Sequence, residues 1–277
     1  MLEETVIKLG CFSFMYDRET STRIVDPLTF MRFAHELRLD TVDFALNKGF
    51  PAQDRDYLMR VRLEALRRGL TVGFVEGGGS FVGTDEELKQ RVELAKQSVD
   101  TAVFMGAPMI LLGTGGVPES IRPAMIGCYQ EVCDYALEKR IMVGMRGHAP
   151  VTEPTGDDII RTHKEVNREN FTFSMDTGRW VGSPGVTPKG QWDRSIDFYA
   201  FMEQTVHLAS YVRAKVFKID QGWEEWFDYE RIVKILRSVD FNGTMSIYYL
   251  GKNYSACNDY EGIGLAVKHL RGILAEN

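Results

Sequence analysis

Hydrophobic and polar positions along the chain follow one repeating pattern, in which a short apolar run precedes a longer segment of helical periodicity. Because strands that alternate with helices form βα units, this pattern predicts a parallel sheet covered by helices. We expect strands at 6–14, 41–46, 71–75, 109–112, 141–145, 171–175, 212–219 and 244–249. We expect helices at 27–37, 54–70, 85–106, 119–140, 157–166, 193–209, 229–239 and 260–275.

Capping residues support several of these helix starts. Asp26 is a candidate N-cap, and Pro27 suits the first position of the helix that follows. Thr84 and Glu87 have the spacing of a capping box, which predicts the start of the third helix.

Eight βα units over 277 residues amount to roughly 35 residues per unit, close to what a closed eightfold barrel needs. An open, doubly wound sheet is the alternative. Such sheets usually carry a GxGxxG or GxxxxGK[ST] phosphate signature, and this sequence has neither at the expected place. The sequence therefore predicts an α/β fold, a (β/α)₈ TIM barrel that forms a single domain over residues 1–277.

Composition narrows the partners and the cellular location. The net charge of −6 and the pI near 5.5 disfavour nucleic acid as a partner. The four cysteines show no paired spacing, and no stretch approaches the roughly 18 apolar residues of a spanning helix. We expect a cytoplasmic protein with reduced thiols and no membrane segment.

In TIM barrels the active site lies at the carboxyl ends of the strands, so candidates can be read from those positions. Alternation along the seventh strand places Arg213 and Lys215 on one face. Aromatic residues in strand-end loops can stack on sugars, or they can pack the rim. The candidates are Asp43, Glu76, Arg146, His148, Asp176, Arg179, Trp180, Arg213, Lys215, Trp223, Tyr248 and Tyr249.

A loop without regular structure is expected at 181–192, directly after the sixth strand end. Loops of this length are often lids or binding loops. An ordinary surface excursion is the equal alternative.

Four segments in order resemble a known family. They are MRGHAP at 145–150, MDTGRW at 175–180, RAKVFKID at 213–220 and FNGTMSIYYLG at 241–251. They are similar to strand ends of the xylose-isomerase-like barrels, which include sugar and sugar-phosphate isomerases and epimerases, keto-inositol dehydratases and family-2 apurinic endonucleases. The resemblance implies a divalent metal held by two Glu, one Asp and one His, which polarises a substrate carbonyl or hydroxyl.

The sequence departs from that ligand set at three of its four positions. Arg146 stands at the first Glu position, Arg213 at the His position and Tyr248 at the closing Glu position, while Asp176 is kept. Two inward guanidiniums oppose a cation, so we expect no metal and no other cofactor. A relocated metal on Glu76, Asp176 and His148 is an alternative that requires Arg146 to swing away.

The resemblance implies an isomerase, epimerase or lyase acting on a small sugar-derived carbonyl or sugar-acid substrate. We expect Arg146, Arg213 and Lys215 to stabilise developing negative charge in place of the metal. The full catalytic set predicted is Glu76, Arg146, His148, Asp176, Arg213, Lys215 and Tyr248. The predicted substrate-binding set is Asp43, Arg179, Trp180, Trp223 and Tyr249.

Two other readings are weighed beside this one. The arginines can instead pair with carboxylates in a buried network that closes a dead site, which would make the chain a non-catalytic sugar-binding or complex-forming relative. An endonuclease is disfavoured, because that chemistry needs several metals and this acidic chain has five histidines. By resemblance alone, a homo-oligomer is expected.

Overall fold

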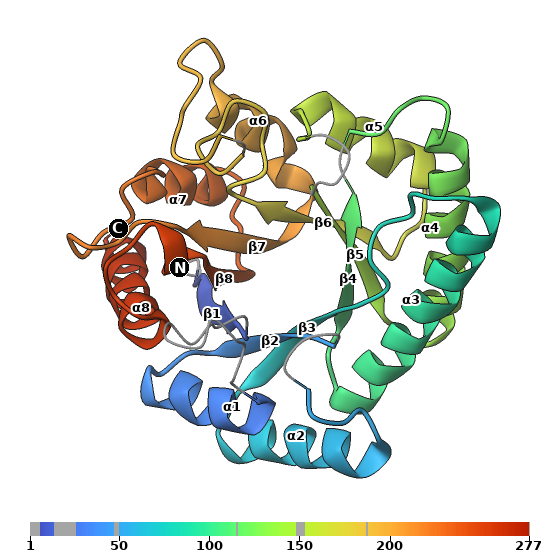
Figure 1. Cartoon of the computed structure of the whole chain (residues 1–277), viewed down its shortest axis with the longest axis horizontal. Helices are drawn as coiled ribbons and strands as arrows, with labels where there is room; N and C mark the ends of the chain where they lie inside the picture. The colour runs from blue at the N-terminus through green and yellow to red at the C-terminus, as the bar shows by residue number, and fades with distance from the viewer. Residues whose placement is uncertain are drawn as a thin grey trace.

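In a computed structural model, the chain forms a closed barrel of parallel strands, in the order β1 to β8, surrounded by helices (Figure 1). The structure describes residues 6–13, 26–46, 50–114, 116–147, 153–186 and 188–276. Each strand pairs in parallel with its neighbours in sequence, and β8 closes the barrel on β1. The predicted (β/α)₈ TIM barrel is therefore confirmed.

The barrel strands are short, and most of their residues are buried on both faces. They are β1 (Lys8–Phe12), β2 (Thr41–Ala45), β3 (Thr71–Glu76), β4 (Met109–Thr114), β5 (Met142–Gly147), β6 (Phe171–Asp176), β7 (Ala209–Val216) and β8 (Thr244–Tyr249).

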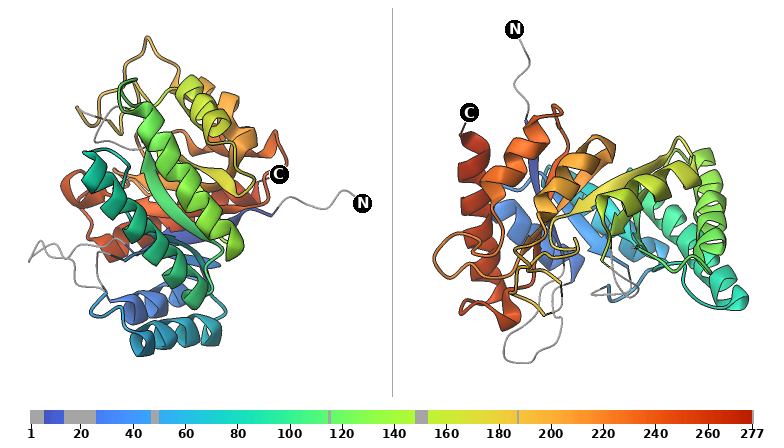
Figure 2. Two further views of the ribbon diagram at one scale, coloured as in Figure 1. Left: turned by 90° about the vertical axis from the view of Figure 1, so that its right-hand side faces the viewer. Right: turned by 90° about the horizontal axis from the view of Figure 1, so that it is seen from above.

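A helix follows each strand and packs against the outside of the barrel. The helices are α1 (Pro27–Glu36), α2 (Arg55–Arg67), α3 (Asp85–Met105), α4 (Arg122–Glu138), α5 (Gly156–Val166), α6 (Phe198–Thr205), α7 (Tyr229–Arg237) and α8 (Asp259–Ala275). Figure 2 shows α3 and α4 lying side by side over β4 and β5. Within the described residues, no helix is long and apolar enough to cross a membrane.

The capping signals read from the sequence are confirmed. Asp26 accepts hydrogen bonds from the backbone N–H groups of Leu28 and Thr29 at the start of α1. Thr84 and Glu87 form the predicted capping box at the start of α3.

Most of the predicted bounds differ from the observed ones by one to three residues, and α6 and β7 show the clearest local reasons. Helix α6 begins at Phe198 instead of at residue 193, because Asp193 accepts from Ser195 in a turn and Asp197 acts as the N-cap. Strand β7 begins at Ala209 and ends at Val216, three residues earlier at each end than expected. The first three residues of β7 include the polar Ser210 and Tyr211, so the apolar run in the sequence begins only at Val212.

A polar group lies within the aromatic interior of the barrel. Asp43 accepts hydrogen bonds from the Tyr211 hydroxyl at 2.8 Å, from the Phe74 backbone N–H at 3.1 Å and from the Ser246 hydroxyl. A Cβ on Gly73 would stand 2.3 Å from the Tyr211 hydroxyl, so only glycine leaves room there. We call Asp43, Phe74, Tyr211 and Ser246 the floor, because they form a buried layer beneath the carboxyl ends of the strands.

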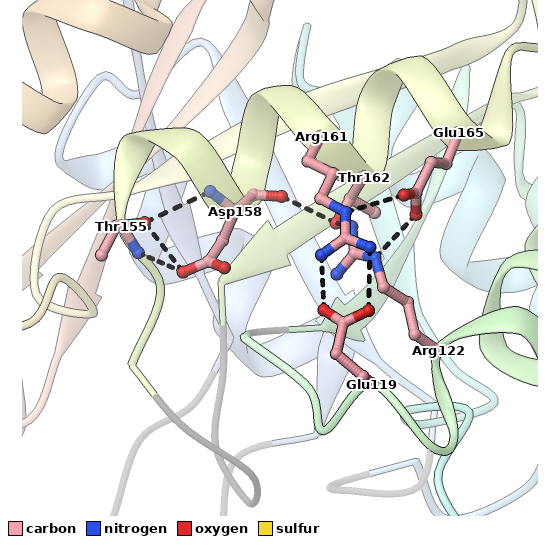
Figure 3. Close-up of polar contacts among 7 residues, drawn as sticks. All are labelled: Glu119, Arg122, Thr155, Asp158, Arg161, Thr162 and Glu165. Atoms are coloured by element: carbon pink, nitrogen blue, oxygen red, sulfur yellow. Dashed lines mark hydrogen bonds and ion pairs between the residues drawn. The ribbon is translucent and has the colours of Figure 1, made fainter.

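Helices α4 and α5 are joined on the outside of the barrel by an ionic cluster, which we call the α4–α5 clamp (Figure 3). Arg122 donates to Glu165 at 2.6 Å and to the Thr162 hydroxyl at 3.0 Å. Arg161 donates to the other oxygen of Glu165 at 2.8 Å and to both oxygens of Glu119. The clamp consists of Glu119, Arg122, Arg161, Thr162 and Glu165, and it fixes α5 just after its Thr155–Asp158 capping box.

Candidate active site at the barrel mouth

Five charged side chains from four strands converge at the carboxyl end of the barrel. We call them the mouth cluster: Glu76 at the end of β3, Arg146 on β5, Asp176 at the end of β6, and Arg213 and Lys215 on β7. All five belong to the predicted catalytic set, and Tyr248 on β8 lies beside them. The seventh member of that set, His148, lies outside the described residues.

Each carboxylate of the mouth cluster is shared by two cations. Arg146 Nη2 donates to Glu76 Oε1 at 2.8 Å, and Arg213 Nη2 lies 3.4 Å from Glu76 Oε2. Asp176 Oδ2 lies 3.5 Å from Arg213 Nη1 and 3.3 Å from Lys215 Nζ. Apart from the Arg146–Glu76 bond, these distances exceed those of close charge-assisted hydrogen bonds.

Aromatic rings surround the guanidinium of Arg213. Its central carbon lies 4.5 Å from the ring centre of Tyr248, 5.2 Å from that of Phe12 and 6.0 Å from that of Phe74. Lys215 Nζ lies 3.7 Å from the ring centre of Tyr248. Cation–π contacts of this kind hold the two cations although Arg213 is only 1% exposed.

Mutual electrostatics set the charge states. Burial alone would raise the pKa of Glu76, but Arg146 and Arg213 outweigh it and hold that pKa below its usual value. Lys215 and Arg213 likewise outweigh burial and lower the pKa of Asp176. Burial lowers the pKa of Lys215 well below its usual range, and Arg213 adds to this effect against the attraction of Asp176.

Asp43, predicted to bind substrate, lies in the buried layer described above instead of at the surface of the mouth. Its side chain is fully buried, and its three hydrogen bonds occupy both oxygens. Burial raises its pKa to about 7, although these hydrogen bonds and Arg213 oppose the rise. Asp43 is therefore closed to a ligand in this structure, and its link to the mouth cluster is the electrostatic attraction of Arg213.

Two of the predicted binding aromatics pack inside the protein. Trp180 is 1% exposed and lies against Phe173 and Phe201, between β6 and α6. Tyr249 is buried on the outer face of β8, where it packs against Gly262 of α8. Both side chains are closed to a ligand in this conformation.

The other two predicted binding residues lie in the loops above the barrel. Arg179 is half-buried, and its charge contributes to the lowered pKa of Asp176, which places it near the mouth cluster. Trp223 is 53% exposed, in the loop after β7. Both stay predictions as substrate-binding residues.

Sequence reasoning missed the residues that support the cluster from below. Phe74, Tyr211 and Ser246 each precede a site residue by two positions, at Glu76, Arg213 and Tyr248 respectively. Because alternate strand residues share a face, that spacing was the available signal. It shows that interior positions next to a candidate belong to the same site.

The residues present at the mouth do not fit the family's divalent metal. Arg146 and Arg213 already contact the oxygens of Glu76 and Asp176 that would face such an ion. Within the described ranges, no group of three or more His, Cys, Asp or Glu side chains converges. The relocated site with His148 involves a residue outside those ranges, and it would require Arg146 to leave Glu76.

A model of the xylose isomerase-like TIM barrel family matches residues 31–273. The chain belongs to this family. The family resemblance predicted from the four strand-end segments is therefore confirmed, and the match covers most of the barrel. No curated protein matches the chain in sequence.

Solved structures with the same fold match over nearly the whole chain. A D-psicose 3-epimerase from Clostridium cellulolyticum H10 matches with TM-score 0.76 and 12% identity, covering 97% of this chain and 99% of that one. A xylose isomerase-like TIM barrel protein from Mycobacterium smegmatis, in complex with magnesium, has TM-score 0.69, 14% identity and coverages of 97% and 96%. A protein from Bacillus anthracis described as the probable 3-DHS dehydratase has TM-score 0.71, 12% identity and coverages of 98% and 100%. At these identities, the similarity shows the fold alone.

Proposed function

We propose that this chain is a cytoplasmic enzyme of the isomerase, epimerase or lyase type, which acts on a small sugar-derived carbonyl or sugar-acid substrate without a divalent metal. The observation that carries the proposal is the convergence of Glu76, Arg146, Asp176, Arg213 and Lys215 at the carboxyl ends of the strands. TIM-barrel enzymes place their chemistry at this end.

The proposed reaction moves a proton at the carbon next to a carbonyl. Glu76 is the proton acceptor, because its side chain is 24% exposed and Arg146 and Arg213 keep it ionised. Tyr248 is the proton donor, because burial raises its pKa and keeps it protonated. His148, two residues after Arg146 and one position beyond the described strand end, stays a second candidate for proton transfer.

Positive charge takes the part that a metal would play in stabilising the enediolate oxygen. Arg146 and Arg213 share Glu76, and Arg213 and Lys215 share Asp176. Fixed donors in a buried site need no reorganisation during the reaction. The names of structurally similar proteins, an epimerase and a dehydratase among them, support a reaction of this class.

The second candidate is a non-catalytic relative that binds a sugar or another protein. The 2.8 Å bond between Arg146 and Glu76 favours it, because a base held by a guanidinium is a weaker base. The proposed enzyme therefore requires that substrate binding loosen this bond.

Exchange of substrate C–H for solvent deuterium separates the two candidates. The purified chain is incubated in D₂O with separate ketoses, aldoses and sugar acids, and proton NMR follows the loss of the signal next to the carbonyl. We expect exchange with at least one compound, and a loss of about 10²-fold or more in Glu76→Gln. The control is Glu225→Gln, which removes a carboxylate paired with Lys218 outside the cluster. Ligand binding without any exchange would support the non-catalytic relative.

A further inference from the structure

The charges of the mouth cluster do not balance. Three cations, Arg146, Arg213 and Lys215, face two carboxylates, Glu76 and Asp176. Guanidiniums stay protonated in proteins, so neither arginine can relieve the excess by losing a proton. With Lys215 protonated, one positive charge lacks a matching carboxylate within the cluster. Burial and Arg213 lower the pKa of Lys215, and a bound anion would favour its protonated form.

Donor groups on the two arginines are also unused. Among the described residues, none accepts a hydrogen bond from Nε, Nη1 or Nη2 of Arg213, or from Nε or Nη1 of Arg146. Both side chains are more than nine-tenths buried. A buried donor without an acceptor is destabilising, more so when it is charged, so a site that keeps several is expected to gain an acceptor on binding.

The geometry around Arg213 indicates what that acceptor is. Aromatic rings lie around its guanidinium, and Tyr248 is 4.5 Å away. Glu76 shows the preferred partner in the protein itself, since its two oxygens face Arg146 and Arg213. A planar group with two oxygens and one negative charge matches both the guanidinium forks and the single excess charge.

We propose that Arg146 and Arg213 bind the carboxylate of the ligand, so that this barrel selects sugar acids over neutral sugars. The inference rests on the proposed function for the reaction at the neighbouring carbon, but the anion site itself does not require catalysis. At the position where the family resemblance implies a metal cation, the protein itself supplies the positive charge, and the ligand supplies the negative charge.

Matched acids and amides test this inference without knowledge of the natural substrate. Acetate, glycolate and D-gluconate are compared with acetamide, glycolamide and D-glucitol at constant ionic strength, by thermal shift and titration calorimetry. We expect the acids to raise the melting temperature with increasing concentration, and the neutral compounds to leave it unchanged. Arg213→Gln should weaken acid binding by about 10- to 100-fold, the equivalent of one lost charged hydrogen bond.

Two further variants keep the test decisive. Circular dichroism shows whether Arg213→Gln folds. If it does not, Arg146→Gln takes its place in the test, and it should weaken acid binding in the same way. Arg161→Gln removes an arginine that already binds Glu119 and Glu165 in the clamp, so it should leave acid binding unchanged.

Four outcomes would overturn the carboxylate assignment. Equal shifts with acids and neutral compounds, no shift at all, or acid binding that survives both mouth variants would remove the anion site. Stronger binding of inorganic phosphate than of the acids would replace the carboxylate by a phosphate. Acid binding without deuterium exchange would leave this inference standing and count against the proposed reaction alone.

Discussion

The mouth cluster and the α4–α5 clamp are built from the same residue types but differ in how completely their charges are used. The clamp pairs two arginines with two glutamates, and Arg122 and Arg161 each donate to two side chains. The mouth cluster sets three cations against two carboxylates, and the guanidinium of its most buried arginine donates no hydrogen bond to any described residue. The difference separates an ionic cluster that holds the fold together from one that is built to receive a ligand.

The largest expected effect comes from breaking the clamp at its buried end. Arg122 is 3% exposed, so Arg122→Met would remove the donor to the Thr162 hydroxyl and leave Glu165 with Arg161 alone. The lost hydrogen bond to the carboxylate costs about 1.5–3 kcal/mol, and this is the most buried bond of the clamp. Urea denaturation measures the loss, and an unchanged midpoint would show that the clamp contributes nothing to stability.

The buried carboxylate beneath the mouth predicts a pH dependence. Because the pKa of Asp43 rises to about 7 on folding, its contribution to stability is complete below its ordinary pKa of 3.8 and is lost as pH rises through 7. The free energy of unfolding should fall by up to about 1.4 kcal/mol per pH unit between pH 5 and pH 7 on this account. Urea denaturation of wild type and Asp43→Asn across that range measures the slope.

Glu224, buried in the loop between β7 and α7, also makes the free energy of unfolding fall with rising pH, because burial raises its pKa to about 7. Asp43→Asn should therefore reduce the wild-type slope by roughly half and not abolish it. A slope that is the same in both proteins would mean that Asp43 is ionised in the folded chain at pH 5.

A smaller effect is expected at the exposed end of the clamp. The Arg161 side chain is 49% exposed, and its partner Glu119 is 71% exposed. Exposed ion pairs contribute about 0–1 kcal/mol, so Arg161→Met should cost less than about 1 kcal/mol in the same denaturation experiment. A cost equal to that of Arg122→Met would mean that burial does not distinguish the two ends of the clamp.

The smallest effect on stability is expected where the most buried arginine is removed. Arg213→Met leaves two cations facing two carboxylates in the mouth, and its apolar side chain can occupy the space between Phe12, Phe74 and Tyr248. Each carboxylate keeps one cation, Arg146 for Glu76 and Lys215 for Asp176, so no buried carboxylate is left unpaired and we expect a change within about 1 kcal/mol. A loss as large as that of Arg122→Met would make Arg213 a structural residue and remove the contrast between the clusters.

The sequence predicted the fold well because the barrel repeats one strong local pattern. Strand β8 matches its expected bounds of Thr244–Tyr249, and the capping box at Thr84 marks the start of α3 where predicted. The register of β7 was harder, since the pattern of apolar residues does not show a strand whose inner face carries Tyr211, Arg213 and Lys215.

The members of the site were predictable, but their connections were not. Five residues were predicted as site residues from their places near the carboxyl ends of the strands, and the barrel does bring them together: Glu76, Arg146, Asp176, Arg213 and Lys215. Nothing in the sequence showed which carboxylate each cation contacts, or that Trp180 and Tyr249 point into packed layers outside the barrel. Those outcomes depend on side-chain direction and on loop packing, which strand order alone does not determine.

The central claim is that cations of the protein occupy the position where this family's barrels are expected to hold a metal. Elemental analysis of the purified chain, after incubation with Mn²⁺, Mg²⁺, Co²⁺ and Zn²⁺ and removal of free ions, tests it most directly. The account predicts metal well below one ion per chain, and a melting temperature that EDTA leaves unchanged. One tightly held ion per chain that is lost in Asp176→Asn would contradict it.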